Sequence, residues 1–573
     1  MTTQVAGPST RAFGVDVQYA VFLLMLMLVA SFVLMPVSII FIYSFNNAGL
    51  LGQSGAWSVD AWRSAFSEPG MLAAIQNTFK VLIVTEAIAM PVAIVIAWLV
   101  ARTDLPARGM LEFLFWISFF LPPLSVTQGW IILLSPNAGA LNQLAVQLPF
   151  IDDGPFNIYS FWGIIWAHLA TQAISVKVML LIPSFRNLDA SFEEAARTSG
   201  ADRWQTLRMI VVPVGLPAIL TVLVLSTIRV LQTFEIEMVL GPAFNFWVFG
   251  TMIFRIVETV PPQFGAAAAL ATTVFLLVVP LIVLHRWLLT RKDYTSITGR
   301  GGVAPTRLGS WRMPIFTFIC IIVVMLTLLP VTFLVMASFM KLIGFFTIPD
   351  PWTFDHWQRV LGDSFFVRAL QNTVKVAGST AIVSIVFCSL IAYFAVRSRY
   401  AGRGVLDFLS WLPFTIPGIL LGIGILFVVL SNPFTRVLYG TLPVLVLAIA
   451  VAHMTLGTQI VKSTVLQLGK TLEEAGRTSG ATWWYCMRKI VMPILAPTLI
   501  LVGIVNFIGA TRDVASVALL AANDTKTLSL LQLDYLTDGR LEVGAVISVV
   551  MIALTTGVAF LARMLGLKAG IRG

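Results

Sequence analysis

The sequence predicts an all-α protein that crosses a membrane about twelve times, as two parallel repeats of six helices. Three observations support this prediction: the composition, the length of the apolar segments and an internal repeat. Of the 573 residues, 58% are hydrophobic and 11% are charged, whereas an average soluble domain has about 25% charged residues. The mean hydropathy is +0.91. This composition excludes an ordinary soluble protein and points to a bilayer as the solvent.

Twelve apolar segments are long enough to cross a bilayer, because a transmembrane helix needs about 20 mostly apolar residues. The first six are expected at approximately 19–44, 76–101, 110–134, 158–184, 214–236 and 264–288, and the second six at 313–338, 371–396, 405–430, 438–462, 494–516 and 542–565. The first segment is too long for the apolar region of a signal peptide and follows a start with few charges. We therefore expect the mature protein to retain it as a helix.

The positions of the basic residues predict the orientation. Cytoplasmic loops of membrane proteins are rich in Lys and Arg. With the N-terminus inside, most of the 37 basic residues fall in loops on the cytoplasmic side. We expect a multi-pass protein of the bacterial inner (plasma) membrane with both termini in the cytoplasm. The net charge of +10 then reflects topology, and we expect no nucleic-acid partner.

An internal repeat divides the chain into two similar units. Asn77-Thr78 recurs as Asn372-Thr373 at an offset of 295, and residues 197–201 recur as 477–481 at an offset of 280, after a loop that is shorter in the second copy. Six spans is an even number, so both units enter the membrane from the same side and form parallel repeats. The expected domains are a tail at 1–18, a first unit at 19–289, a cytoplasmic linker at 290–312, a second unit at 313–566 and a tail at 567–573.

The longest polar interruption of each unit lies between its fourth and fifth spans, at about 186–213 and 466–493. Ser191-x-x-Glu194 and Thr471-x-x-Glu474 fit the pattern of a capping box, which predicts a helix start. Gly200 and Gly480 follow where a short helix would end in a left-handed residue. We expect each loop to be a short helix, a bend and a second helix along the cytoplasmic surface.

These two loops carry a family resemblance. The pattern Glu-Ala-Ala, three residues and Gly resembles the EAA loop of permease subunits of binding-protein-dependent ABC importers. The chain is similar to a fused pair of such units with a duplicated MetI-like permease fold, and most similar to ferric iron permeases with two fused halves. The resemblance assigns docking of an ATPase to Glu193, Glu194, Ala195, Ala196 and Gly200 in the first loop, and to Glu473, Glu474, Ala475 and Gly480 in the second. The second loop departs from the pattern at Gly476, where the family has Ala.

The resemblance implies the function and the partners. The chain is expected to be a transport subunit rather than an enzyme, and to move a small solute that a periplasmic or extracellular binding protein delivers. Ferric iron is the expected solute, with thiamine, a phosphonate of the 2-aminoethylphosphonate type or a polyamine as alternatives. Two cytoplasmic ABC ATPase subunits would hydrolyse ATP. The fused halves would make a second permease chain unnecessary, and no cofactor is expected.

The chain lacks a motif of its own for binding ATP. The nearest match to the phosphate loop Gly-x-x-x-x-Gly-Lys-Ser/Thr is Gly469-Lys470-Thr471, but Thr464 stands where the first Gly is required. The rival interpretation is a proton-coupled secondary transporter of the major facilitator type, which also has twelve spans in two parallel sets of six. That class has no reason for two matched loops between the fourth and fifth spans. The four histidines show no metal-ligand spacing, so no metal site is expected.

Ionisable residues inside a span are candidates for a translocation pathway. In the first unit these are Glu86, His168 and Arg229. Near the outer ends of the fifth spans lie Glu235, Glu237, Arg512 and Asp513, where a gate or a contact with the binding protein could form. Ion pairing inside the helix bundle is the alternative explanation for the charges within the spans.

Overall fold

The computed structural model describes residues 17–46, 55–189, 191–290 and 306–564. Within these ranges the chain is helical, with three isolated β-bridges and no strand. The helices of the first half are α1 (Val17–Ser44), α2 (Asp60–Ser67), α3 (Met71–Arg102), α4 (Arg108–Phe120), α5 (Pro123–Leu134), α6 (Ala140–Ala145), α7 (Phe161–His168), α8 (Ile174–Arg186), α9 (Ser191–Thr198), α10 (Arg203–Thr206), α11 (Val212–Val214), α12 (Leu216–Leu231), α13 (Glu235–Leu240), α14 (Phe249–Glu258) and α15 (Phe264–Thr290).

The second half repeats this order. Its helices are α16 (Arg312–Val323), α17 (Leu329–Ser338), α18 (Asp355–Gly362), α19 (Ser364–Arg397), α20 (Arg403–Trp411), α21 (Gly418–Ser431), α22 (Pro433–Arg436), α23 (Leu442–Gln467), α24 (Thr471–Thr478), α25 (Trp483–Cys486), α26 (Met492–Arg512), α27 (Leu528–Thr537) and α28 (Leu541–Met564). Short π-helical turns at Leu169–Ala173, Leu207–Val211, Val324–Leu328 and Met487–Val491 join helices into longer continuous segments.

The described residues form nine helices that are long and apolar enough to span a membrane, or eleven if each of two bent pairs counts as one span. Together with α15, these elements lie at the twelve positions that the sequence predicts. The third span of each half, predicted as one segment, is bent in the structure. Helices α4 and α5 meet at 95°, and the segments Arg403–Thr415 and Gly418–Ser431 meet at 111°. Pro122 and Pro417 stand at the two breaks, and proline provides no N–H for a continuous helix.

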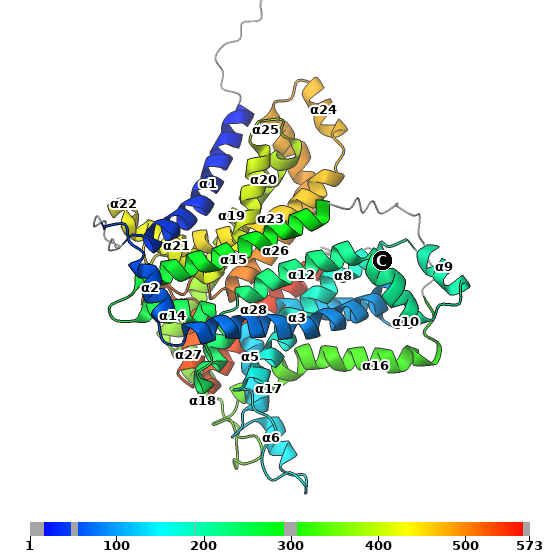
Figure 1. The fold of residues 1–573 in the computed structure, drawn as a ribbon, viewed down its shortest axis with the longest axis vertical. Coiled ribbons are helices and arrows are strands. Elements are labelled where there is room, and N and C mark those ends of the chain that lie inside the picture. Colours follow the sequence, from blue (N-terminus) through cyan, green and yellow to red (C-terminus); the bar gives the residue numbers. More distant parts are fainter. Residues whose placement is uncertain (1–16, 47–54, 190, 291–305, 565–573) are drawn as a thin grey trace, which may run out of the picture.

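The first helix of each half packs against the other half (Figure 1). Helix α1 runs along α20 and α21, where the rings of Tyr43 and Phe427 lie 5.0 Å apart. Helix α17 packs on α5 of the first half, and a Cβ at Gly129 would stand only 2.5 Å from the Pro330 carbonyl oxygen. This close approach requires glycine. The two halves therefore hold each other along their length and do not merely touch at one surface.

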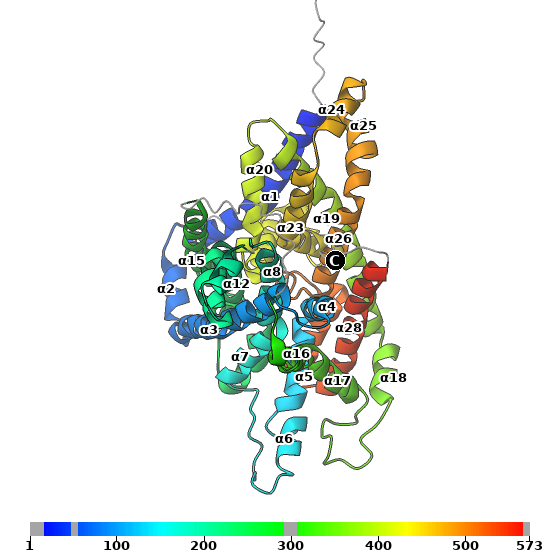
Figure 2. The ribbon, with the colours of Figure 1, turned by 90° about the vertical axis from the view of Figure 1, so that its right-hand side faces the viewer.

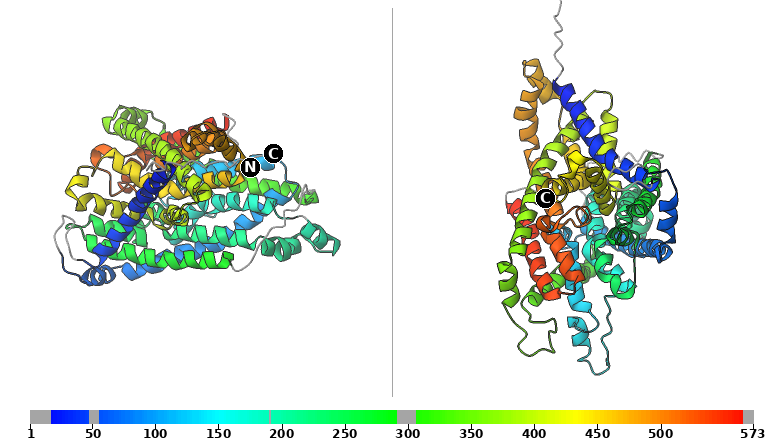
Figure 3. Two further views of the ribbon diagram at one scale, coloured as in Figure 1. Left: turned by 90° about the horizontal axis from the view of Figure 1, so that it is seen from above. Right: turned by 90° about the vertical axis from the view of Figure 1, so that its left-hand side faces the viewer.

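The two ends of the bundle differ. Helices α9 and α10 lie on the same side as the start of α16 (Figure 1). Helices α24 and α25 lie near the start of α1 (Figures 1 and 2). Helices α2 and α22 lie at the left of Figure 1 and α6 and α18 at its bottom, on the side away from α9 and α24. In Figure 1 the two short helices α9 and α24 stand at separate edges of their end, and Figure 3 shows the same separation. Both predicted loops thus lie at one end of the protein.

Candidate functional site

The two loops between the fourth and fifth spans fold alike. Helices α9 and α24 are each followed by a glycine in the left-handed region, Gly200 at φ +85° and Gly480 at φ +86°. Beyond the glycines, the Ala201 N–H donates to the Ala196 carbonyl at 3.0 Å, and the Ala481 N–H donates to the Gly476 carbonyl at the same distance. This is the bond of a helix that ends in a left-handed residue. The predicted left-handed glycines are therefore confirmed.

The capping box predicted at Thr471 and Glu474 is wrong, whereas the one predicted at Ser191 and Glu194 involves a Glu194 side chain that lies outside the described residues. Ser191 and Thr471 are the first residues of their helices and do not precede them. The Ser191 N–H donates to Asp189 Oδ1 at 2.9 Å, and this bond lowers the pKa of the Asp189 carboxyl. Helix α24 is preceded by Lys470, whose side chain makes no capping bond. Each helix therefore starts one residue earlier than a capping box would place it.

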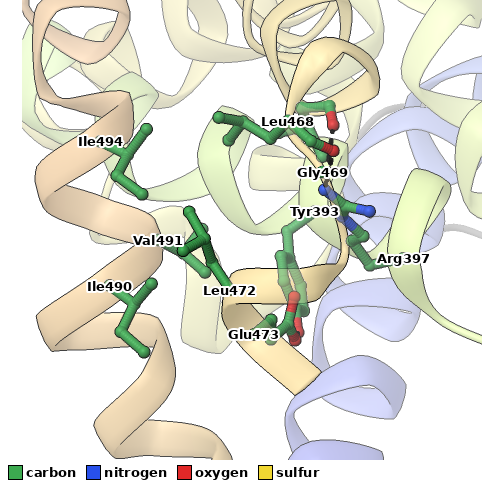
Figure 4. Close-up of a pocket in the computed structure, with 10 residues that line it drawn as sticks. Tyr393, Arg397, Leu468, Gly469, Leu472, Glu473, Ile490, Val491 and Ile494 are labelled. Carbon is green, nitrogen blue, oxygen red and sulfur yellow. Dashed lines mark hydrogen bonds between the residues drawn. The ribbon is translucent and has the colours of Figure 1, made fainter. Parts of the chain in front are cut away.

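Matched arginines fix the start of both loops. Arg102 at the end of α3 donates from Nη1 to the Leu188 carbonyl at 3.1 Å. Arg397, its counterpart at the end of α19, donates from Nη2 to the Leu468 carbonyl at 2.5 Å (Figure 4). Leu188 and Leu468 are themselves equivalent in the repeat. Each loop is thus tied to the second span of its own half.

The first glutamate of each pair anchors its loop. Arg102 Nε donates to Glu193 Oε1 at 2.8 Å, and both side chains are buried. In the second half Glu473 accepts instead from the Tyr393 hydroxyl, which in turn accepts from Trp483 Nε1 at 3.0 Å. Figure 4 shows Tyr393, Arg397 and Glu473 around a small cavity at the base of α24. Glu193 and Glu473 are therefore bonded to their own half.

The other predicted docking residues are mostly exposed. Ala195 and Gly200 in the first loop and Glu474, Ala475 and Gly480 in the second are exposed, while Ala196 is 9% exposed. The side chain of Glu194 lies outside the described residues. At Gly476 an added Cβ would stand 2.9 Å from Ile490 Cδ1 and 3.0 Å from Cys486 Sγ. An alanine here would require the Ile490 or Cys486 side chain to shift.

Two predicted pathway residues form pairs inside the first half. Glu86 is 8% exposed, with Oε1 3.0 Å from Lys177 Nζ and Oε2 accepting from Ser226 Oγ at 2.9 Å. His168 Nε2 lies 2.7 Å from Oε1 of the fully buried Glu237. Lys177 is not among the residues predicted from the sequence, although a lysine in an apolar span is itself a signal. The alternative of ion pairing within the bundle therefore holds for Glu86 and His168.

The remaining pathway candidates lie where the halves meet. Arg512 at the end of α26 donates from Nη1 to the Phe119 carbonyl at 2.5 Å, and its guanidinium lies 5.0 Å from the centre of the Phe119 ring. Arg229 in α12 lies over the ring of Phe414 at 5.6 Å. We call the region around Phe119, Gln232, Phe414 and Arg512 the seam. It lies beside the breaks of the two third spans.

Carboxylates complete the seam. Asp513 Oδ2 lies 3.3 Å from His453 Nε2, and its Oδ1 accepts from the Ser516 N–H at 3.0 Å. Glu235 follows the end of α12 and is partly exposed. Arg229 keeps more than a third of its surface accessible, although it lies deep in the protein. Part of the seam is therefore accessible.

The repeated Asn-Thr pair has a structural role that the sequence analysis did not assign. Thr78 Oγ1 accepts from the Phe249 N–H at 2.9 Å, and Thr373 Oγ1 accepts from the Leu528 N–H at 2.8 Å. These bonds fix the starts of α14 and α27, which lead from the fifth span to the sixth. The recurrence of the Asn-Thr pair at a constant offset is the sequence signal that could have indicated this role. Within the residues described, no group of three or more His, Cys, Asp or Glu side chains could hold a metal ion.

Known proteins match most of the chain. The family model "Binding-protein-dependent transport system inner membrane component" matches residues 89–294 and again 384–569. A probable ABC transporter permease protein, y4fN of Sinorhizobium fredii, is 28% identical over 418 residues, which cover 70% of this chain and 71% of that protein. The ferric transport system permease protein FbpB of Actinobacillus pleuropneumoniae is 25% identical over 463 residues, or 76% of this chain and 63% of that protein. The molybdate/tungstate permease WtpB of Thermococcus kodakarensis is 26% identical over 207 residues, or 36% of this chain and 81% of that protein.

Proposed function

Since the chain belongs to the family of inner membrane components of binding-protein-dependent transport systems, we propose that it is the permease of an ABC importer and contains both halves of the translocation unit. The family match covers two separate stretches, one in each half. This supports the predicted units at 19–289 and 313–566, joined by a linker at 290–312. The family assignment also disfavours the major facilitator alternative.

The single observation that carries the proposal is the pair of anchored loops. Helices α9 and α24 present exposed residues at one end of the protein, while Arg102 and Arg397 tie them to long helices that run toward the other end. We propose that each loop docks on one cytoplasmic ABC ATPase subunit. The anchors would then transmit a movement of the ATPase to α3 and α19.

The transport cycle follows from the separation of the two loops. When ATP closes the ATPase pair, α9 and α24 would approach each other, and the two halves would rotate and open the seam toward the outside. This is alternating access by two bundles around a central pathway. The binding protein would deliver the solute on the side of α2, α6, α18 and α22, away from α9 and α24, and both chain termini would lie on the cytoplasmic side.

We propose ferric iron as the solute. The support is the match to FbpB, which covers 76% of this chain. The match to WtpB favours an oxyanion such as molybdate as the second candidate, but it covers only one half. Thiamine, a phosphonate and a polyamine remain further candidates from the sequence, since no residue of the seam selects among them.

Uptake into vesicles tests the proposal. The chain is reconstituted in proteoliposomes with its ATPase and its binding protein, and ATP-dependent uptake of ferric iron is measured beside molybdate. We expect iron uptake only when ATP, ATPase and binding protein are all present. Uptake driven by a proton gradient without the ATPase would contradict the permease role, whereas ATP-dependent uptake of molybdate alone would contradict only the choice of iron.

Charge reversal tests the docking role. The double variant Glu194→Lys/Glu474→Lys should retain ATP hydrolysis by the ATPase but lose coupled uptake, because the reversed charge at Glu474 and at its repeat equivalent would no longer fit the ATPase surface. Lys470→Glu, an exposed change at the edge of α24, is the matched control. Full coupled uptake in the double variant would contradict the docking role.

A further inference from the structure

Equivalent residues of the two halves make equivalent contacts across the seam, in opposite directions. Phe119 and Phe414 are equivalent at the offset of 295, and Gln232 and Arg512 are equivalent at the offset of 280. Gln232 of the first half donates from Nε2 to the Phe414 carbonyl of the second at 3.0 Å. Arg512 of the second half donates to the Phe119 carbonyl of the first at 2.5 Å. The end of each fifth span thus reaches the break in the other half's third span.

The accepting carbonyls are free because the third spans are broken. In a continuous helix the Phe119 carbonyl would accept from the residue four positions later, which is Pro123 and has no N–H. The short helix Leu412–Thr415, which contains Phe414, ends one residue later, and a helix end leaves its last carbonyls without partners. A buried carbonyl without a partner is costly. The cross-seam donors therefore satisfy groups that the breaks create.

Each contact combines a hydrogen bond to the phenylalanine carbonyl with an arginine that lies over the phenylalanine ring. One residue supplies both interactions at Phe119, and two residues supply them at Phe414. Arg512 both donates to the Phe119 carbonyl and lies over the Phe119 ring. At the other contact Gln232 supplies the hydrogen bond, and Arg229, one turn earlier, lies over the Phe414 ring. A hydrogen bond from a charged donor is stronger than one from an amide. The Arg512 contact should therefore be the tighter of the two.

The contacts lie beside an accessible part of the seam, at Arg229. Arg229 is more than one third accessible, and its guanidinium lies over the Phe414 ring and interacts electrostatically with Asp513 and Glu235. A pathway between the halves cannot widen at the seam while a fifth span of one half is bonded to a third span of the other. Both contacts must break for it to open.

We propose that the Arg512–Phe119 and Gln232–Phe414 contacts are paired locks that hold the pathway closed at the seam, with Arg512 as the dominant positioning residue. The proposal rests on the transport role given above. The locks are distinct from the docking loops because they lie at the seam and depend on two backbone carbonyls. A side-chain substitution cannot remove these carbonyls. Mutation can change only the donor side chains, Arg512 and Gln232, and the rings of Phe119 and Phe414.

Thiol labelling tests the locks without any partner protein. In the full chain with Cys320, Cys388 and Cys486 replaced by Ala, Thr415→Cys places a reporter beside Phe414, at a site that is 4% exposed. The rate of reaction with a hydrophilic maleimide is measured in nanodiscs. We expect Arg512→Met to raise this rate about tenfold, which corresponds to the loss of one charge-assisted hydrogen bond. Arg512→Gln should raise the labelling rate less, because a glutamine amide can still donate a hydrogen bond to the Phe119 carbonyl, as Gln232 does to the Phe414 carbonyl.

Matched variants make the outcome decisive. Phe119→Leu removes the ring contact alone and should raise the rate about threefold, and Gln232→Leu should have a similar effect. Arg255→Gln is the control, because it loses an arginine–ring contact with Trp247 that lies within the first half. A rate within about twofold of the parent in both Arg512→Met and Phe119→Leu would overturn the locks. Uptake by the parent chain is a separate measurement, so failure of transport and failure of the locks are distinguishable.

Discussion

The two halves of the chain share their backbone-directed hydrogen bonds but not their ion pairs. Arg102 and Arg397 both donate to a leucine carbonyl at the start of a loop, and Thr78 and Thr373 both accept an N–H at the start of a helix. In contrast, the Glu86–Lys177 pair of the first half has Ala381 and Gly457 at the equivalent positions of the second.

A duplicated fold explains this difference. A side chain that bonds to the backbone keeps its partner as long as the fold persists, because the backbone group is present whatever the sequence. An ion pair needs two side chains and is lost when either changes. Glu112 and Asp407 illustrate the intermediate case, since the acid is repeated but pairs with Arg186 in one half and Lys462 in the other. Contacts with the backbone that use the same residue type in both halves should therefore contribute equally, and ion pairs should not.

The largest expected effect concerns the pair that only the first half contains. Lys177→Met leaves Glu86 buried without its cation and should lower the free energy of unfolding by about 3–5 kcal/mol, measured by denaturant unfolding in detergent. Glu86→Ala/Lys177→Met removes both charges and should recover most of this loss. An equal loss in the single and the double variant would contradict the assignment of the pair as the stabilising unit.

The outcome for Glu86 shows how far the sequence could lead. Apolar length, the repeat and the left-handed glycines are local signals, and they predicted the spans, the two units and the turns at Gly200 and Gly480. The partner of Glu86 is set by the packing of α3 on α8, which no local pattern encodes. The 95° break at Pro122 and the packing of α1 and α17 each against the other half also depend on how helices meet in space.

The two loop glycines should respond equally. Gly200→Ala and Gly480→Ala place a side chain at a φ near +85°, which should cost about 1–2 kcal/mol for each loop. Local stability is measured by hydrogen exchange of α9 and α24. The control is Gly404→Ala, at a helical glycine with open space around it. A loss confined to one loop would show that the two loops are not equivalent.

The smallest effects are expected at the duplicated threonines. Thr78→Val and Thr373→Val each remove one acceptor from a helix start, and each should lower the free energy of unfolding by about 1 kcal/mol. Denaturant unfolding of both variants, with the exposed Thr347→Val as a control, measures this. Effects that differ by more than about twofold between the halves would break the rule that backbone-directed contacts are equivalent.

The central claim is that the two loops act together as the connection to the ATPases. Ser199 and Ser479 are equivalent and exposed, one at the end of each docking helix. Spin labels at Ser199→Cys and Ser479→Cys, in a background without native cysteines, report the distance between the loops in the complete importer. We predict that ATP shortens this distance and that hydrolysis restores it. A distance unchanged by ATP, in a complex that still imports its solute, would contradict the account.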